Sequence, residues 1–150
     1  MGIRKVCAFA QFELSSDTII QGEGGGISSR IPFNVVPENQ GFTLDTVTRS
    51  IVADVPGVYL VIFNLYVQGV ANQGAAYSIR LNGIEEYFFG FEPNLGRNRL
   101  VGQGILRLNA GDTVQITNTG NTADTLVTSA DGQQTAAAAL TLTKICELPS

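Results

Sequence analysis

The chain of 150 residues contains no histidine, which is the side chain that most often serves as a general base or binds a catalytic metal. No Gly-x-Ser-x-Gly elbow is present, and Lys5 and Lys144 stand outside any Ser-x-x-Lys context. Glu85 and Glu86 are neighbours in a strand-like segment, so they point to opposite faces and form no catalytic carboxylate pair. The sequence therefore predicts a protein that is not an enzyme.

Acidic residues in two loop-like regions are the remaining candidates for binding a metal. Asp17 and Glu23 lie in the first region, and Asp124 and Asp131 lie in the polar segment 119–135. Calcium takes several oxygen ligands, which typical sites supply from one short contiguous loop, and neither pair forms such a pattern. We therefore expect solvated loop carboxylates and no metal site.

Composition and charge limit the partners. The net charge is −4, acidic and basic residues are mixed, and no Lys/Arg-rich block appears, so neither a nucleic acid nor an anionic membrane is expected. The longest apolar stretch, residues 58–67, is interrupted by Asn64 and is too short for a transmembrane helix. Residues 8–13 break the apolar run that a secretory signal needs. The glycine-rich residues 21–26 lack a following Lys-Ser/Thr, so no nucleotide cofactor is expected.

Short strands must position these side chains, because the dominant pattern has a period of two. Apolar and polar residues alternate in 77–81 and 114–117, and Asn82-Gly83 stands between two strand-like runs, which is a strong hairpin signal. No linker divides the chain, so we expect one all-β domain over residues 1–150. The expected strands are 6–12, 42–44, 49–53, 58–68, 76–81, 86–91, 100–108, 113–118 and 136–145, with turns at 37–41, 55–57, 73–74, 93–96 and 109–112.

Two of the expected strands, 58–67 and 136–145, are apolar on both faces. An antiparallel sandwich strand normally shows water one face, so a second buried surface is expected. Two interpretations stay open: another subunit covers that surface, which small alanine side chains would favour, or a loop of the same chain does. The candidates for the core or for a subunit interface are Tyr59, Phe63, Tyr66, Ala137, Ala139, Leu140 and Leu142.

The segment 33–63 resembles the signature of the complement C1q domain. At the spacing of that signature stand Phe33, Asn39, Leu44, Ile51, Gly57, Tyr59, Val61 and Phe63. Ile51 and Val61 depart from it, since the family prefers Phe there, but both keep apolar volume in a strand. Residues 108–114 resemble the family's Leu-x-x-Gly-Asp-x-Val turn, and residues 137–144 stand where the family has its closing strand, so the resemblance covers nearly the whole chain.

The resemblance implies a ten-stranded antiparallel jelly-roll sandwich of the C1q and tumour necrosis factor type, forming a homotrimer. In such folds the first and last strands are antiparallel neighbours in the inner sheet, which faces the threefold axis. That arrangement would bring Cys7 close to Cys146, and three states stay open: a disulfide within the chain, two buried thiols, or a cross-link between chains. Gly57, Gly111 and Asp112 are expected to shape structural turns.

The resemblance also implies a function in assembly. The terminal domains of collagen-like spore-surface proteins are similar in being short, His-poor and rich in Ala, Thr, Asn and Gly. We therefore expect a structural module of a bacterial spore surface (exosporium) or cell surface, with copies of itself and other surface-layer proteins as partners. The alternative is a receptor- or glycan-binding head of a fibre or of a longer extracellular protein, which would use residues 84–99 and 119–135 and the aromatic side chains of Tyr87, Phe88, Phe89 and Phe91.

Overall fold

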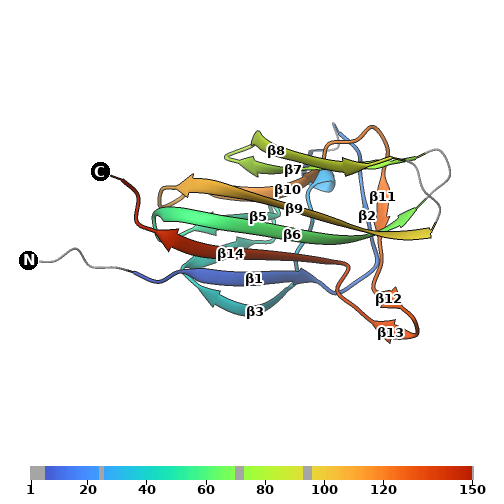
Figure 1. The fold of residues 1–150 in the computed structure, drawn as a ribbon, viewed down its shortest axis with the longest axis horizontal. Coiled ribbons are helices and arrows are strands. Elements are labelled where there is room, and N and C mark those ends of the chain that lie inside the picture. Colours follow the sequence, from blue (N-terminus) through green and yellow to red (C-terminus); the bar gives the residue numbers. More distant parts are fainter. Residues whose placement is uncertain (1–5, 24–25, 70–72, 93–95, 150) are drawn as a thin grey trace, which may run out of the picture.

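A computed structural model describes residues 6–23, 26–69, 73–92 and 96–149, which form two antiparallel sheets around a shared hydrophobic core (Figure 1). One sheet has the strand order β2-β11-β6-β14-β1-β3, with β9 also paired to β6, and the other has the order β4-β5-β10-β7-β8. The strands are β1 (Phe9–Leu14), β2 (Thr18–Ile20), β3 (Val35–Gln40), β4 (Phe42–Asp45), β5 (Ser50–Ala53), β6 (Gly57–Gly69), β7 (Ala75–Leu81), β8 (Ile84–Phe91), β9 (Gly96–Leu108), β10 (Thr113–Asn118), β11 (Asp124–Leu126), β12 (Ser129–Ala130), β13 (Gln133–Gln134) and β14 (Ala138–Cys146), and a 3-10 turn η1 spans Gly26–Ser29.

Ten of the described strands have four or more residues, the number that a C1q-like jelly roll implies. The other four, β2, β11, β12 and β13, have two or three residues each, and three of them lie within 119–135, where we expected only a loop. A pattern with a period of two is not visible in so few residues, because the pairing of such short strands depends on tertiary contacts. The first and last long strands, β1 and β14, are antiparallel neighbours, as the resemblance implies.

The expected turn at 37–41 is wrong over most of its length, because residues up to Gln40 belong to β3. Among the described residues this strand pairs with β1 alone and lies at the edge of the seven-stranded sheet, where the missing N–H of Pro37 is tolerated. The chain turns at Gly41, which has a φ of +97°. The Asn39 side chain closes that turn by donating to the carbonyl of Phe42 (2.8 Å) and accepting from its N–H (3.2 Å).

The hairpin between β7 and β8 turns at Asn82 and Gly83, as that pair predicts. Their φ angles are +51° and +80°, the left-handed backbone that a two-residue hairpin turn requires. Leu81 and Ile84 then pair across the hairpin. The expected turn at 93–96 falls largely outside the described residues.

The core is centred on β6, which has β14 on one side and β9 on the other. The Tyr59 ring meets Phe42 of the opposite sheet edge-on at 5.2 Å between centroids, and Phe63 meets Phe89 at 5.5 Å. These contacts join the two sheets and leave the other face of β6 directed away from the core. The β6 side chains that point inward are all at most 1% exposed: Tyr59, Val61, Phe63, Leu65 and Val67.

Candidate functional site

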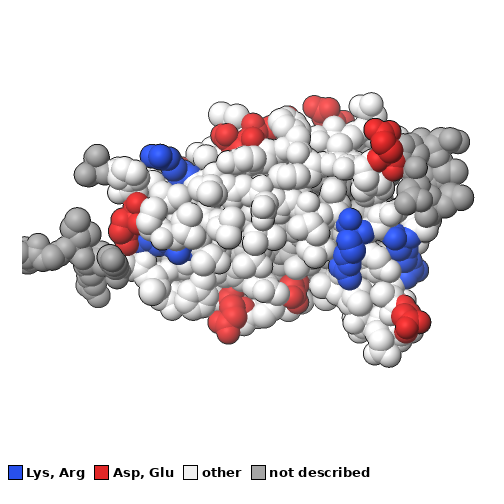
Figure 2. Space-filling view, viewed as in Figure 1, with Lys and Arg blue, Asp and Glu red and all other residues white. Residues whose placement is uncertain are grey.

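The outward face of the seven-stranded sheet carries a grid of mostly uncharged side chains over β1, β14, β6 and β9. Strand register sets them in three rows, which we call the self-association face: Phe9, Thr143, Leu60 and Ile105; Gln11, Thr141, Ile62 and Gln103; Glu13, Ala139, Asn64 and Val101. Glu13 is the one charged side chain among these twelve residues and stands at the end of its row. Figure 2 shows the middle of this face white, with charged residues gathered toward its ends and rim.

Several apolar side chains of the self-association face are open to solvent. Phe9 is 40% exposed, and Val101 and Ile105 are each 53% exposed. Leu60 and Ile62, between them, are half-buried. Exposed apolar side chains with few charges around them are typical of a surface that a partner covers.

A small cationic cluster borders this face at the start of β9. The Arg99 guanidinium lies 4.4 Å from the centroid of the Tyr66 ring, and that of Arg97 lies 6.0 Å from it. Arg97 also donates through Nε to Gln68 Oε1 at 3.1 Å. Tyr66 is therefore covered on the outward side by cations of its own chain.

The residues that we selected from the two doubly apolar strands separate into two surfaces. The first group has no solvent exposure within a single chain and belongs to its core: Tyr59, Phe63, Ala137, Leu140 and Leu142. Ala139 and Tyr66 are half-buried on the outward side. The sequence analysis did not select Phe9, Val101 and Ile105 as interface candidates. The alternation of odd and even positions along β6 was the available signal, because it separates inward from outward positions.

The glycines expected to shape turns act in different ways. Gly111 has a φ of +92°, and the adjacent Asp112 accepts from the Asn109 N–H at 2.7 Å. Gly57 has no left-handed backbone; instead, a Cβ there would lie 2.7 Å from Cε of Lys144. Its expected turn role is therefore replaced by a packing role against the Lys144 stem.

Cys7 and Cys146 come together at one end of the β1–β14 pair. Both are free thiols, both are exposed, and both line a pocket of about 240 Å³ beside Lys144. The alternative of two buried thiols is wrong, because each is open to solvent. Because both thiols line the same pocket, the formation of a disulfide between them stays a prediction.

The aromatic residues of β8 pack mainly into the fold. Tyr87, Phe89 and Phe91 are partly buried against the core, whereas Phe88 is 62% exposed. Three of the four thus serve packing, and Phe88 alone presents an aromatic ring to solvent.

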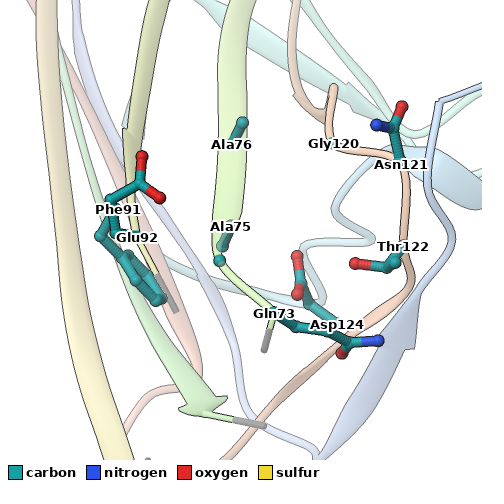
Figure 3. A pocket seen from close by; sticks show the side chains of 10 residues that line it. Gln73, Ala75, Ala76, Phe91, Glu92, Gly120, Asn121, Thr122 and Asp124 are labelled. Atoms are coloured by element: carbon teal, nitrogen blue, oxygen red, sulfur yellow. The ribbon is translucent and has the colours of Figure 1, made fainter. Parts of the chain in front are cut away.

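The expectation that Asp124 is a solvated loop carboxylate is wrong. Asp124 begins β11 and is 7% exposed. It lines a pocket of about 350 Å³ together with Thr122 and Phe91. Figure 3 shows Phe91 on one side of Ala75 and Thr122 on the other. Asn118 Nδ2 donates to its Oδ2 at 3.2 Å. Burial raises the pKa of Asp124 to about 6.

Asp17 has a structural partner. Its Oδ1 accepts from the N–H of Thr128 (2.8 Å) and from its hydroxyl (2.7 Å), and these bonds lower the pKa of Asp17. Across the described ranges, no three His, Cys, Asp or Glu side chains are placed to hold a metal ion. The part of the chain that the structure describes also has no helix of the length and apolarity needed to cross a membrane.

The comparisons with known proteins agree on this fold. The family model described as the BclA C-terminal domain matches residues 11–146. No curated protein sequence matches this chain. Among solved structures, Eiger TNF from S. frugiperda is 15% identical with a TM-score of 0.74, over 97% of both chains.

Two further structures share the architecture. The globular domain of zebrafish complement 1qA is 16% identical with a TM-score of 0.64, over 96% of this chain and all of the other. Murine APRIL is 10% identical with a TM-score of 0.60, over 93% of this chain and all of the other. At these identities the structures establish the C1q- and TNF-like jelly roll alone.

Proposed function

Because this chain belongs to the BclA C-terminal domain family, we propose that it is a non-enzymatic structural module that forms a homotrimer in a bacterial spore or cell-surface layer. The self-association face carries this proposal. It presents exposed apolar side chains, and the one carboxylate in its rows stands at the rim. Removing such a surface from water is the main favourable term in protein association.

The shape of the face suits a close approach of another copy. Ala139 and Thr141 are small and lie in the middle of the grid, on β14 between β6 and β1. A closed ring of three copies needs a face and a different, complementary patch on the same chain. The second patch therefore lies outside the self-association face, which already includes Val101 and Ile105.

The family supports the proposed location and the proposed further partners. Terminal domains of collagen-like spore-surface proteins resemble this chain in being short, His-poor and rich in Ala, Thr, Asn and Gly. A trimer of them would contact other surface-layer proteins through residues outside the self-association face.

The mass in solution tests the trimer. Size-exclusion chromatography with light scattering should give roughly 48 kDa, three times the 15.9 kDa chain. A particle of 15.9 kDa at all concentrations would rule out the trimer and the interpretation of the face.

A receptor- or glycan-binding head is the second candidate, favoured by Phe88 at 62% exposure on β8. Exposed aromatic rings frequently stack on a bound partner. If this function holds, Phe88→Ala should abolish the binding of the protein to a glycan array and leave its mass in solution unchanged. If the structural function alone holds, neither property should change.

A further inference from the structure

Both cysteines of the chain meet at the end of the sheet where β1 begins and β14 ends (Figure 1). Cys7 comes shortly before β1, and Cys146 is the last residue of β14. The N–H of Lys144 donates to the carbonyl of Ala8 at 2.9 Å, so the antiparallel pairing of the two strands extends to this end. Both thiols are free and exposed, and both line one pocket of about 240 Å³.

A β-bulge at Ile145 turns Cys146 toward the side of the sheet on which Cys7 lies. The register of β14 against β6 shifts at the bulge, and Cys146 stands opposite Val58, an outward position of β6. Such a bulge re-aims the side chains beside it. Cys7 is on the outward side as well, because the next residue, Ala8, is 3% exposed and faces the core. The two thiols therefore open to solvent on the same side of adjacent strands.

The other side chains of this pocket do not compete with the sulfur atoms as ligands. The Lys144 ammonium group donates to Glu147 Oε1 at 2.6 Å and to the carbonyl of Val6 at 2.7 Å. The charges of Lys144 and Glu147 compensate each other, so binding in this pocket depends on bonds to sulfur and not on net charge. Val6 and Ile145 contribute apolar side chains, which are 41% and 51% exposed.

Two thiolates without a third ligand suit an ion that accepts two-fold coordination. Structural Zn(II) sites use four ligands, and no three His, Cys, Asp or Glu side chains are grouped for a metal in the described ranges. Calcium and magnesium prefer several oxygen ligands. Cu(I) is a soft ion that prefers thiolates, and it is stable with two sulfur ligands on opposite sides.

The spacing of neighbouring strands is compatible with such an ion. Side chains that face each other across antiparallel strands have Cβ atoms about 4.5–5.5 Å apart. Two sulfur atoms on opposite sides of one ion lie about 4.6 Å apart, which is twice a typical metal–thiolate bond. An ion can therefore join two thiols on adjacent strands without separating the strands.

We propose that Cys7 and Cys146 form a binding site for one Cu(I) ion. Each thiol releases its proton to solvent, and each sulfur donates an electron pair to the ion. Copper stays Cu(I) throughout, so the step needs neither an oxidant nor a reductant. The site does not depend on the proposed trimer, because both ligands belong to one chain.

The test is a titration of the reduced whole chain with Cu(I) under nitrogen. The ultraviolet charge-transfer band of copper thiolate reports binding, and the chromogenic chelator ferrozine reports copper that the protein does not hold. We expect the band to rise to a break at one Cu(I) per chain, with ferrozine colour appearing only beyond the break. Light scattering should give the same mass before and after loading, and added Zn(II) should not displace the copper.

Three variants connect the binding to the two sulfur atoms. Cys7→Ser and Cys146→Ser each replace one sulfur by oxygen at an exposed position, and each should weaken Cu(I) binding at least about 100-fold. Glu147→Gln is the matched control in the same pocket. It removes a carboxylate that the site does not use as a ligand, so it should bind Cu(I) as the parent does.

Ferrozine colour from the first addition of copper to the parent would overturn the site. Parent-like binding by either serine variant would show that the two thiols do not act together and would overturn it as well. A loss in Glu147→Gln as large as that in the serine variants would contradict coordination by two thiolates. An increase of mass on loading would place the copper between chains and overturn a site within one chain.

Discussion

The aromatic ring of Tyr87 lies over Gly104, so close that a Cβ at this glycine would be 2.5 Å from two ring carbons. The Tyr87 hydroxyl also donates to the carbonyl of Ile105 at 2.9 Å. Tyr87 belongs to the edge strand β8 of one sheet, and Gly104 and Ile105 belong to the edge strand β9 of the other. This contact closes the sandwich along that side.

Gly104→Ala is therefore expected to destabilise the protein by about 1–3 kcal/mol, because the added methyl overpacks the site. The midpoint of urea unfolding measures it. In a Tyr87→Leu background the same substitution should cost less, since the ring that it meets is gone. An equal cost in both backgrounds would show that the ring contact is not the cause.

Tyr59 predicts a loss of stability at alkaline pH. Its hydroxyl donates to the Val55 carbonyl at 2.7 Å, and burial, followed by the charges of Glu147 and Asp54, raises its pKa from 10.0 to about 12. The folded state holds this proton more tightly than the unfolded state, so its stabilisation is complete below pH 10 and is lost as the pH rises toward 12.

Tyr59→Phe should cost about 1 kcal/mol at pH 7 through the lost hydrogen bond. It should also flatten the decline in the free energy of unfolding above pH 10. Tyr77, whose pKa burial raises well above 10, keeps part of that decline in the variant. Parallel pH profiles of parent and variant would contradict the role of Tyr59.

Asp124 predicts a pH dependence in the acidic range. Its pKa is about 6 in the folded chain against an ordinary 3.8, so the folded state binds the extra proton between these values. Stability is therefore greatest below pH 4 for this group and falls as the pH rises through 6. Asp124→Asn removes that decline, and urea midpoints from pH 4 to 7 should show the parent losing stability relative to the variant.

The sequence predicts features that depend on local geometry. Asn82-Gly83 specifies its hairpin because the turn needs two left-handed residues in succession. The signature from Phe33 to Phe63 indicates the family because its spacing follows strands that cross the core, and Tyr59 and Phe63 are both fully buried.

Features that depend on tertiary contacts were not predictable in this way. The sequence around Pro37 predicts a turn, yet Pro37 lies in β3. The strand tolerates a proline because β3 is at the edge of its sheet, where a backbone N–H need not pair. Asp124 reads as a solvated acid, yet Asn118 and the turn at Gly120 enclose it. On β9, the outward Val101 and Ile105 alternate with the inward glycines Gly102 and Gly104, so the sequence shows no alternation of apolar and polar residues there. The rings of Phe89 and Tyr87, from the other sheet, fill the space beside these glycines.

The two cysteines predict a change in stability on oxidation. Both thiols are exposed in one pocket, so we expect a mild oxidant to remove both from thiol titration without forming covalent dimers. Closing a loop of nearly the whole chain would stabilise the fold by about 4–5 kcal/mol in the chain-entropy model. Cys146→Ser should show no such gain, and a ladder of reductant-sensitive oligomers would instead indicate cross-links between chains.

If the self-association face is the trimer interface, a charge introduced at Val101 and one introduced at Val47 should affect the mass in solution differently. Val101 is 53% exposed within the grid, and Val47 is 80% exposed in the turn between β4 and β5. Val101→Glu would bury an unpaired carboxylate in a trimer interface, which costs several kcal/mol, whereas an exposed turn tolerates the same change. Light scattering should therefore give 15.9 kDa for Val101→Glu and roughly three times that mass for Val47→Glu. A trimeric Val101→Glu would place the interface elsewhere, and dissociation of both variants would show that added charge alone, without regard to position, separates the subunits.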